Sequence, residues 1–256
     1  MENKKILITI NDLKDINRLK KLGITNYVYP LKDFCVGYPN TFLISDIPND
    51  GYVLVNRILD NKGILELENI IKNGLKVKGI IFDDLGIIPL IKDLGLEKIL
   101  YLSHFNTNYE SINIYLEYVD SVVVATDITK KEIEAIASRL PNKLTLFVLG
   151  YVGIMYSRRK LLDNYSKYHK LDYENDLVVQ NTGHKFRIVE SSYGTYFYHD
   201  TCFAGLDLLK LPAKYYFINS VFLSIGDIEK LLNGQSDLVT DRGFLETETI
   251  YKLKGE

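Results

Sequence analysis

The chain has few of the residues that build disulfide or metal scaffolds, and it carries little net charge. Only two cysteines, Cys35 and Cys202, occur in 256 residues, too few for a disulfide framework or a four-cysteine zinc or iron–sulfur site within this chain. The 31 Lys and Arg against 33 Asp and Glu give a net charge of −2, which excludes a global basic field for nucleic acid but leaves room for a local patch. We expect this chain alone to hold no metal and no cofactor.

Long apolar runs are also missing. No segment approaches the roughly 20 apolar residues that span a bilayer, and the apolar stretch from Ile6 is interrupted by Asn11 and Asp12, unlike a signal peptide. The remaining composition, with 46% apolar and 25% charged residues, is that of an ordinary globular protein. The sequence predicts a soluble, cytoplasmic protein with no membrane partner.

What the sequence does have is an alternation of short apolar runs and amphipathic segments. The runs are nearly solid apolar, as in KGIIFDD and DSVVVAT, which is typical of parallel strands covered on both faces. Glycine ends several of the helical segments between them, and Thr129 with Glu132 has the spacing of a capping box. These features predict an α/β fold, either a (β/α) barrel or a doubly wound sheet. Strands are expected at Lys5–Ile10, Tyr27–Tyr29, Phe42–Ser45, Tyr52–Asn56, Gly79–Phe82, Lys98–Leu102, Ser121–Ala125 and Leu144–Gly150.

The pattern changes after the last of these strands. Residues 163–176 are polar and show no apolar period, so we expect a long loop or a helix lying across the barrel mouth. Two β-rich runs, Lys185–Glu190 and Tyr193–Tyr198, predict a hairpin, and a final strand follows at Lys214–Ser220. The sequence therefore predicts one domain over the whole chain (1–256), with a loop and hairpin inserted at about 160–210, before the last strand.

Polar residues follow the predicted strands, at the end of a parallel barrel where chemistry is built. His104 can act as a general base near neutral pH, but no second His or Cys lies nearby in sequence to complete a metal site, so a hydrogen-bonded rim residue is the alternative. Asp83 and Asp84 are the other catalytic candidates. Because neighbouring side chains on a strand point to opposite faces, one of the two is expected to cap the following helix.

The densest basic cluster is Ser157-Arg158-Arg159-Lys160, which follows two tyrosines. Cations next to aromatic rings suit phosphate contact with base stacking, and a solvated loop entering a helix is the plainer interpretation. The expected binding residues are Asn56, Arg57, Asn106, Tyr151, Tyr156, Ser157, Arg158, Arg159 and Asn219.

Several segments, in order along the chain, resemble those of one known family. LFVLGYVGIMYSRRKLLDNYSKY, at residues 146–168, is similar to the strand ending FVHGA and the YSGRC and LSNY segments of peptidase family U32, the collagenase-like peptidases. Upstream, GYVLVNRIL, IIFDDLGIIPLIKDLG, LSHFNTNYESINIYLE and ATDITKKEI resemble successive family segments. Downstream, GHKFRIVESSYGTYFYHDTCFAGLDLL resembles the hairpin of the family. The resemblance spans most of the chain.

The resemblance implies a TIM-like (β/α) barrel with the hairpin inserted before the last strand. It also implies a choice of activities, because the family includes peptidases and proteins linked to hydroxylation of tRNA or rRNA bases or to ubiquinone biosynthesis. Several of the latter proteins hold an iron–sulfur cluster through four cysteines.

This chain departs from the family at those positions. Leu149 replaces the family's His, Gly153 replaces its first cluster cysteine, and Lys160 replaces the cysteine that closes YSGRC. Asn219 and Val221 stand where the eighth strand of the family has Glu and Arg. The chain therefore resembles a degenerate member that lacks the family's cysteines and cannot hold the cluster.

Three functions remain open from the sequence. The leading hypothesis is an accessory or non-catalytic protein that works beside a larger, cysteine-bearing U32 paralogue in hydroxylation of a tRNA or rRNA base. The second is an active U32-type peptidase or a cluster-independent enzyme that uses His104, Asp83, Asp84 and Arg159. The third is a module that binds RNA or a small molecule at a tyrosine-rich mouth.

Overall fold

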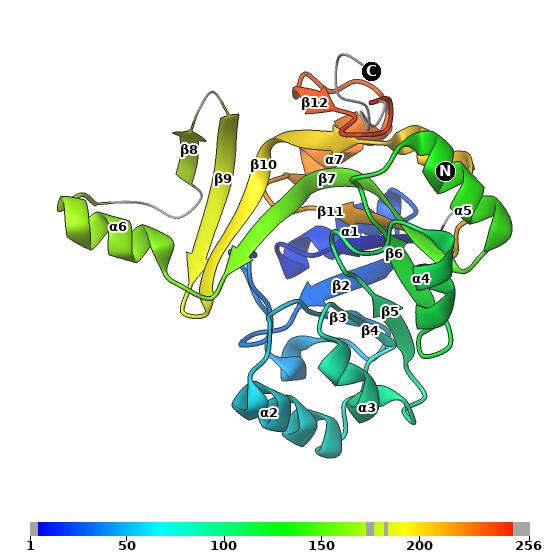
Figure 1. Cartoon of the computed structure of the whole chain (residues 1–256), viewed down its shortest axis with the longest axis horizontal. Coiled ribbons are helices and arrows are strands. Elements are labelled where there is room, and N and C mark those ends of the chain that lie inside the picture. Colours follow the sequence, from blue (N-terminus) through cyan, green and yellow to red (C-terminus); the bar gives the residue numbers. More distant parts are fainter. Residues whose placement is uncertain (1–4, 173–176, 182–183, 248–256) are drawn as a thin grey trace, which may run out of the picture.

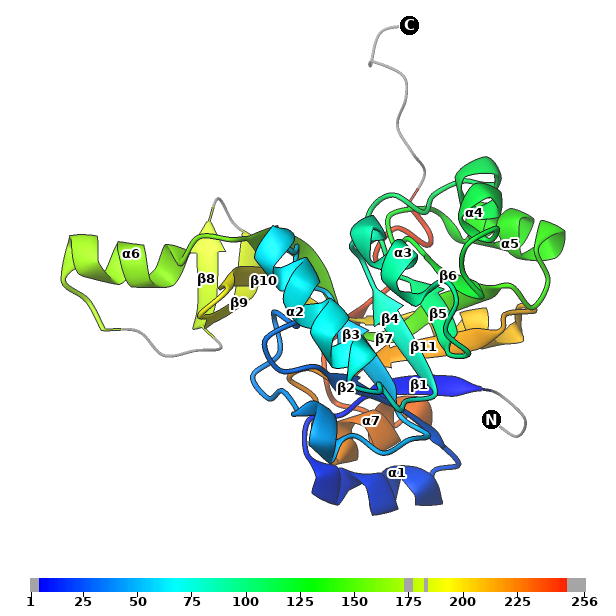
Figure 2. The same ribbon diagram turned by 90° about the horizontal axis from the view of Figure 1, so that it is seen from below.

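The computed structural model of the chain describes residues 5–172, 177–181 and 184–247. Eight parallel strands close into a barrel, because β11 pairs with β1 at one edge and with β7 at the other. The structure is the TIM-like α/β barrel that the sequence predicts, with helices outside the strands (Figures 1 and 2). The barrel strands are β1 (Ile6–Thr9), β2 (Asn26–Pro30), β3 (Tyr52–Val55), β4 (Gly79–Phe82), β5 (Glu97–Leu100), β6 (Ser121–Val124), β7 (Leu144–Ser157) and β11 (Tyr215–Asn219).

Local sequence signals begin the outer helices. Thr129 and Glu132 form the predicted capping box at the start of α5, and Asp60 caps α2 by accepting a hydrogen bond from the Gly63 amide at 2.8 Å. Such caps satisfy amides that the first helical turn leaves without partners. The helices are α1 (Ile16–Lys21), α2 (Asn61–Lys72), α3 (Ile88–Ile91), α4 (Tyr109–Tyr115), α5 (Lys130–Arg139), α6 (Leu161–His169) and α7 (Ile225–Leu232).

The barrel interior is a packed core. β1, β3, β4 and β6 are buried at every position, as expected for parallel strands that helices cover. Aromatic rings pack together in this core. The ring centroid of Phe147 lies 5.8 Å from that of Phe203 and also 5.8 Å from that of Phe217. The barrel is therefore a support for residues at its ends and has no open channel at its centre.

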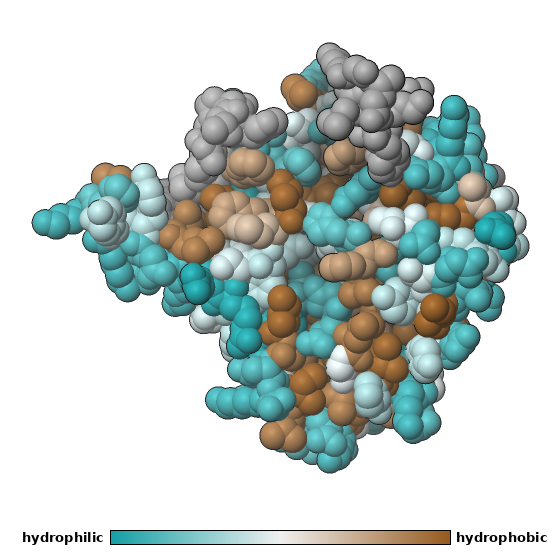
Figure 3. Space-filling view, in the orientation of Figure 1, coloured by the Kyte–Doolittle hydropathy of each residue, from teal (hydrophilic) through white to brown (hydrophobic). Residues whose placement is uncertain are grey.

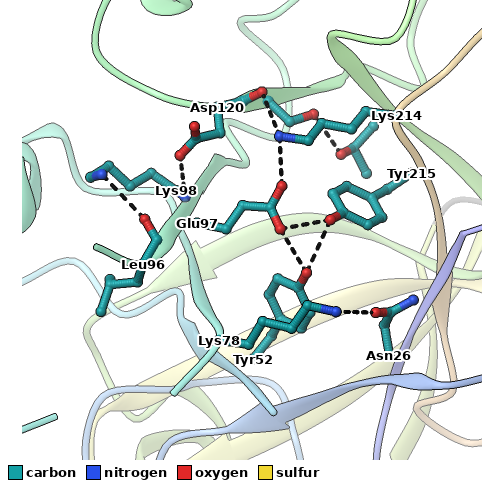
Figure 4. Close-up of polar contacts among 11 residues, drawn as sticks. Asn26, Tyr52, Lys78, Leu96, Glu97, Lys98, Asp120, Lys214 and Tyr215 are labelled. Carbon is teal, nitrogen blue, oxygen red and sulfur yellow. Dashed lines mark hydrogen bonds and ion pairs between the residues drawn. The ribbon is translucent and has the colours of Figure 1, made fainter. Parts of the chain in front are cut away.

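A polar network holds together the amino-terminal end of the barrel (Figure 4). The Glu97 carboxylate on β5 accepts hydrogen bonds from the hydroxyls of Tyr52 on β3, at 2.7 Å, and Tyr215 on β11, at 2.6 Å. Its other oxygen pairs with the Lys214 ammonium at 2.6 Å. Burial opposes ionisation of Glu97, but the bonds from Lys214, Tyr215 and Tyr52 outweigh it and hold the pKa of Glu97 below its usual value.

β7 runs on past the barrel into a second sheet. It pairs with β11 as far as Gly150 and continues to Ser157 as the antiparallel partner of β10 (Gly194–Ala204). The β9–β10 hairpin is the predicted insertion before the last strand, and β9 (His184–Ser191) also pairs with a strand that the sequence did not predict, β8 (Leu177–Asn181). We call the described part of residues 151–204 the arm, which projects from the barrel in both views (Figures 1 and 2).

α6 belongs to the arm and leads away from the barrel (Figure 1), so the expectation of a loop or helix across the mouth was wrong in its position. The reason is a cap from the hairpin. The Glu190 carboxylate on β9 accepts hydrogen bonds from the amides of Leu162, at 2.8 Å, and Asp163, at 2.9 Å. This non-local cap fixes the first turn of α6 to the arm.

The predicted strand at Phe42–Ser45 was wrong. Phe42 forms a single bridge with Leu31, and a short 3₁₀ helix, η2 (Ile44–Asp46), follows. Both edges of β2 are already occupied by β1 and β3. An apolar run at this point therefore has no free strand edge to join.

Among the described residues, no helix is both long and apolar enough to cross a membrane.

Candidate functional site

The carboxyl end of the barrel, where barrel chemistry is located, is covered by the arm. β10 crosses this end as the partner of β7, and its Tyr196 and Tyr198 have ring centroids 4.8 Å apart. Tyr38 and Tyr101 lie beside them. Burial is the main reason why the pKa of each of these four tyrosines is raised, and for Tyr38, Tyr101 and Tyr198 the proximity of other tyrosines of the group adds to it. We call Tyr38, Tyr101, Tyr196 and Tyr198 the tyrosine cluster.

Small residues make room for the tyrosine cluster. The Tyr198 hydroxyl donates to the Gly37 carbonyl at 2.8 Å, and a Cβ atom at Gly37 would lie 2.6 Å from that hydroxyl. A Cβ atom at Gly153 would collide with the Tyr196 hydroxyl. The space at the carboxyl end of the barrel is thus filled largely by the chain's own side chains.

Asp83 lies against the tyrosine cluster, immediately after β4. Its Oδ1 is buried and has no hydrogen-bond partner among the described residues. Burial, and after it the charge of Asp84, raises the pKa of Asp83 to about 7. In turn, the charge of Asp83 adds to the effect of burial on the pKa of Tyr101 and Tyr196. A carboxyl group with this pKa can give or take a proton near neutral pH.

Asp84 has the expected capping role. Its Oδ1 accepts from the Gly86 amide at 2.9 Å, at the start of the short helix that follows β4, and its Oδ2 accepts from the Leu59 amide at 3.1 Å. Both oxygens therefore hold loops in place, and the two neighbouring aspartates have separate roles.

His104 lies exposed on the rim. Its Nδ1 lies 2.5 Å from Asp127 Oδ2, and its Nε2 lies 3.2 Å from the carbonyl oxygen of Ile154. Both ring nitrogens therefore have a protein oxygen within hydrogen-bond distance, and these contacts hold the ring in place on the rim.

The three predicted binding asparagines hold backbone. Asn56 receives the Val36 amide on its Oδ1 at 2.8 Å, and Asn219 donates to the Tyr151 carbonyl at 3.0 Å. Asn106 donates to the Val123 carbonyl at 2.9 Å. Its Oδ1 is buried without a hydrogen-bond partner among the described residues, so Asn106 alone of the three keeps a free buried acceptor.

Of the remaining binding candidates, some line a cavity and the others do not. Arg57, Tyr156 and Arg158 line a cavity of about 280 Å³ between α2 and the arm. Figure 2 shows α2 beside the base of the arm. Tyr151 is buried instead, with its ring 5.4 Å from that of Phe222. Ser157 and Arg159 do not line this cavity; the Ser157 hydroxyl accepts from the Arg159 amide at 3.2 Å in the turn before α6.

The residues present do not fit a four-cysteine cluster. The thiol of Cys35 is buried and donates to Asn56 Oδ1 at 2.9 Å. Burial raises the pKa of both cysteines, to about 11 for Cys202, whereas cluster ligands are thiolates. The position of the first expected cluster cysteine, Gly153, has no space for a side chain beside Tyr196.

Sequence reasoning missed the tyrosine cluster and the arm side of the cavity. Tyr196 and Tyr198 alternate in GTYFYHD, which places them on one face of a strand. That spacing was a usable signal, but the position of the strand over the barrel was not visible locally. The ring centroid of Tyr193 lies 4.2 Å from the guanidinium carbon of Arg57. Tyr193 belongs to the predicted hairpin, but its place beside the cavity was likewise not visible in the local sequence.

Comparison with known proteins gives one family match. A family model described as peptidase family U32 matches residues 45–220, which is more than half of the chain. No curated protein and no solved structure matches.

Proposed function

The chain belongs to peptidase family U32, and from this premise we propose that it is a non-catalytic, accessory member. In this proposal it works in the cytoplasm beside a larger, cysteine-bearing paralogue that hydroxylates a tRNA or rRNA base. In this proposal the partner carries out the hydroxylation. Several of the family members linked to that reaction hold an iron–sulfur cluster, and the residues of this chain do not fit one.

The observation that carries the proposal is the tyrosine cluster. In a TIM-like barrel the substrate enters at the carboxyl end, and here Tyr196 and Tyr198 from β10 are packed into that end. Where the eighth strand of the family has a charged pair, this chain has two neutral, buried residues, Asn219 and Val221. A filled mouth that lacks this charged pair supports a role other than turnover.

The arm offers a surface for a partner. On α6, the residues Tyr165 and Tyr168 are 58% and 83% exposed, and Leu171 just beyond the helix is 54% exposed. Large exposed side chains of this kind are typical of contact surfaces. Figure 3 shows hydrophobic residues where the arm joins the barrel and a mostly hydrophilic tip at α6, so we expect the tyrosines to serve as anchors within a polar rim.

Affinity purification of the tagged full chain from its native cells, followed by mass spectrometry, tests the accessory role. We expect one cysteine-rich U32 paralogue in about equal amount. Loss of the chain should also lower hydroxylation of the RNA base that the paralogue modifies. Recovery of the chain alone, together with unchanged RNA hydroxylation in its absence, contradicts the proposal.

A matched pair of variants sharpens this experiment. Tyr165→Ala with Tyr168→Ala changes the exposed face of α6 and should abolish recovery of the paralogue. Tyr118→Ala removes a tyrosine of similar exposure, 55%, from a site beyond α4, and it should leave recovery intact. Equal effects of the two changes contradict a contact through the arm.

A cluster-independent enzyme is the second candidate function, and Asp83 is the observation that favours it. An unpartnered buried carboxyl group with a pKa of about 7 has the properties of a general acid or base. If the isolated chain converts a peptide or tRNA substrate, Asp83→Asn should abolish the conversion. Asp93→Asn, a change at an exposed aspartate, should not affect it.

A further inference from the structure

The cavity between α2 and the arm contains a largely buried cation, Arg57. The Arg57 side chain lies among the lining residues and is only 7% exposed. Its guanidinium carbon lies 4.2 Å from the ring centroid of Tyr193 and 5.5 Å from that of Phe34. Among the described residues, no carboxylate forms an ion pair with it within 4.0 Å. The stacked rings offset part of the cost of burying this charge, and an anion in the cavity would supply the missing partner.

Two further cations line the same cavity, and each is only weakly paired. Arg158 lies 3.3 Å from Asp60, and both side chains are more than half exposed. Lys62 lies 3.6 Å from Glu66 on the surface of α2. Exposed pairs of this kind contribute about 0–1 kcal/mol, so an incoming anion can replace their carboxylates at little cost.

The walls and the size of the cavity narrow the class of ligand. Tyr156 and Tyr193 line it beside the cations, and an aromatic ring is a stacking surface for a base or another planar group. The volume of about 280 Å³ is near the lower end of small-molecule sites, which span roughly 300–1,000 Å³. Two guanidinium forks match the oxygens of a phosphate in pairs.

We propose that this cavity binds the phosphoryl group of a nucleotide, with Arg57 and Arg158 on the phosphate and a tyrosine ring against the base. The phosphate comes either from a free nucleoside monophosphate or from single-stranded RNA. The cavity lies outside the tyrosine cluster, so the proposal goes beyond the accessory role and does not depend on it.

Isothermal titration of the full chain tests the site with three probes: inorganic phosphate, adenosine 5′-monophosphate and an eight-nucleotide oligouridine. Arg57→Gln and Arg158→Gln should each weaken binding by about tenfold or more, the loss expected when a charge-assisted hydrogen bond is removed. Asp60→Asn removes the nearest negative charge but keeps a good helix N-cap, so it should strengthen binding a few-fold.

Arg139→Gln is the matched control. Arg139 stacks on Tyr109 at 4.1 Å, much as Arg57 stacks on Tyr193, but it does not line the cavity. The change should leave the affinity of every probe as it is. Arg158 is exposed, so its substitution keeps the test valid even where Arg57→Gln lowers the melting temperature.

The pattern across probes identifies the source of the phosphate. Saturable binding of adenosine monophosphate that follows these variants assigns the site to a free nucleotide. Binding of oligouridine alone, with the same variant pattern and a loss of affinity with added salt, assigns it to RNA. Absence of saturable binding, or binding that ignores all three cavity variants, overturns the proposal. Neither result alters the outcome of the co-purification experiment.

Discussion

Glu97 lies at the amino end of β5, and Asp83 lies just past the carboxyl end of the neighbouring strand β4. The barrel thus separates two carboxyl groups of the same chemistry. Glu97 receives two tyrosine hydroxyls and the Lys214 ammonium, and these bonds outweigh burial and lower its pKa. Asp83 has a buried oxygen with no hydrogen-bond partner in the described part of the chain, and burial raises its pKa to about 7.

The comparison shows that the carboxyl groups at the two ends of the barrel have different roles. The bonds of Glu97 join β3, β5 and β11 across the interior, so its charge contributes to closing the barrel. The buried oxygen of Asp83 joins no other element among residues 5–172, 177–181 and 184–247. An unpaired buried acid of this kind costs stability, and such groups are common at functional sites.

The largest effect is expected from breaking the satisfied end. Glu97→Ala removes the acceptor of Lys214, Tyr52 and Tyr215. Because the Lys214 and Glu97 side chains are 25% and 17% exposed, the loss in the free energy of unfolding should approach, from below, the cost of about 3–5 kcal/mol for removal of one partner from a fully buried ion pair. Urea unfolding followed by circular dichroism measures this loss. The control Glu68→Ala removes a carboxylate that pairs with Lys72 on the surface of α2, at a cost of about 0.5 kcal/mol or less. Equal losses in the free energy of unfolding would mean that Glu97 contributes no more than an ordinary surface charge.

The unsatisfied end is tested by pH. The folded-state pKa of Asp83, about 7, is above the usual value of 3.8, so between these values the folded chain binds more protons than the unfolded chain. Its contribution to stability is therefore full below about pH 4 and is lost as the pH rises to about 7. We expect wild type to lose up to about 4 kcal/mol more than Asp83→Asn between pH 4 and 8, the free energy that corresponds to a pKa raised from 3.8 to about 7. Parallel pH profiles of the two proteins contradict a raised pKa.

The barrel was predictable because its strands carry their own signal. Runs such as SVVV and GIIF are buried along their whole length, and that is what a parallel strand between helices and core requires. The capping box at Thr129 was equally local. Sequence reasoning therefore predicted the elements whose structure depends on residues close to them in the chain.

The site depends on distant contacts: the sequence named Asp83 and three residues of the cavity wall, Arg57, Tyr156 and Arg158, but not the tyrosine cluster. The strand expected at Phe42–Ser45 failed because both edges of β2 are occupied, and α6 starts on a cap from Glu190, 28 residues away from Leu162. Of the predicted site, Asp84 has the helix-capping role that was expected of one of the two aspartates. Asp83 was named from its place after a strand, but its missing partner is a property of the folded mouth.

A smaller effect tests whether the tyrosine cluster really fills the mouth. Gly153→Ala places a methyl group against the Tyr196 ring, and Tyr196→Leu shortens that side chain. We expect the double variant to be more stable than the sum of the single changes predicts, with a coupling energy of about 1 kcal/mol. Gly95→Ala, where an added Cβ meets open space, is the control and should change stability little. Additive effects mean that the two residues do not share one space.

The smallest effect is expected at His104, which lies at the same end of the barrel as Asp83 but in contact with solvent. Its pair with Asp127 has side chains 45% and 34% exposed, and pairs of this kind contribute about 0.2–1 kcal/mol. His104→Ala should therefore lower the free energy of unfolding by no more than this at pH 7, and Asp127→Asn should do the same. A loss of several kcal/mol from either change would mean that the pair is screened from water, and His104 would then belong with Glu97 as a structural charge. A small loss would set His104, an exposed rim residue, apart from Glu97, whose charge contributes to closing the barrel.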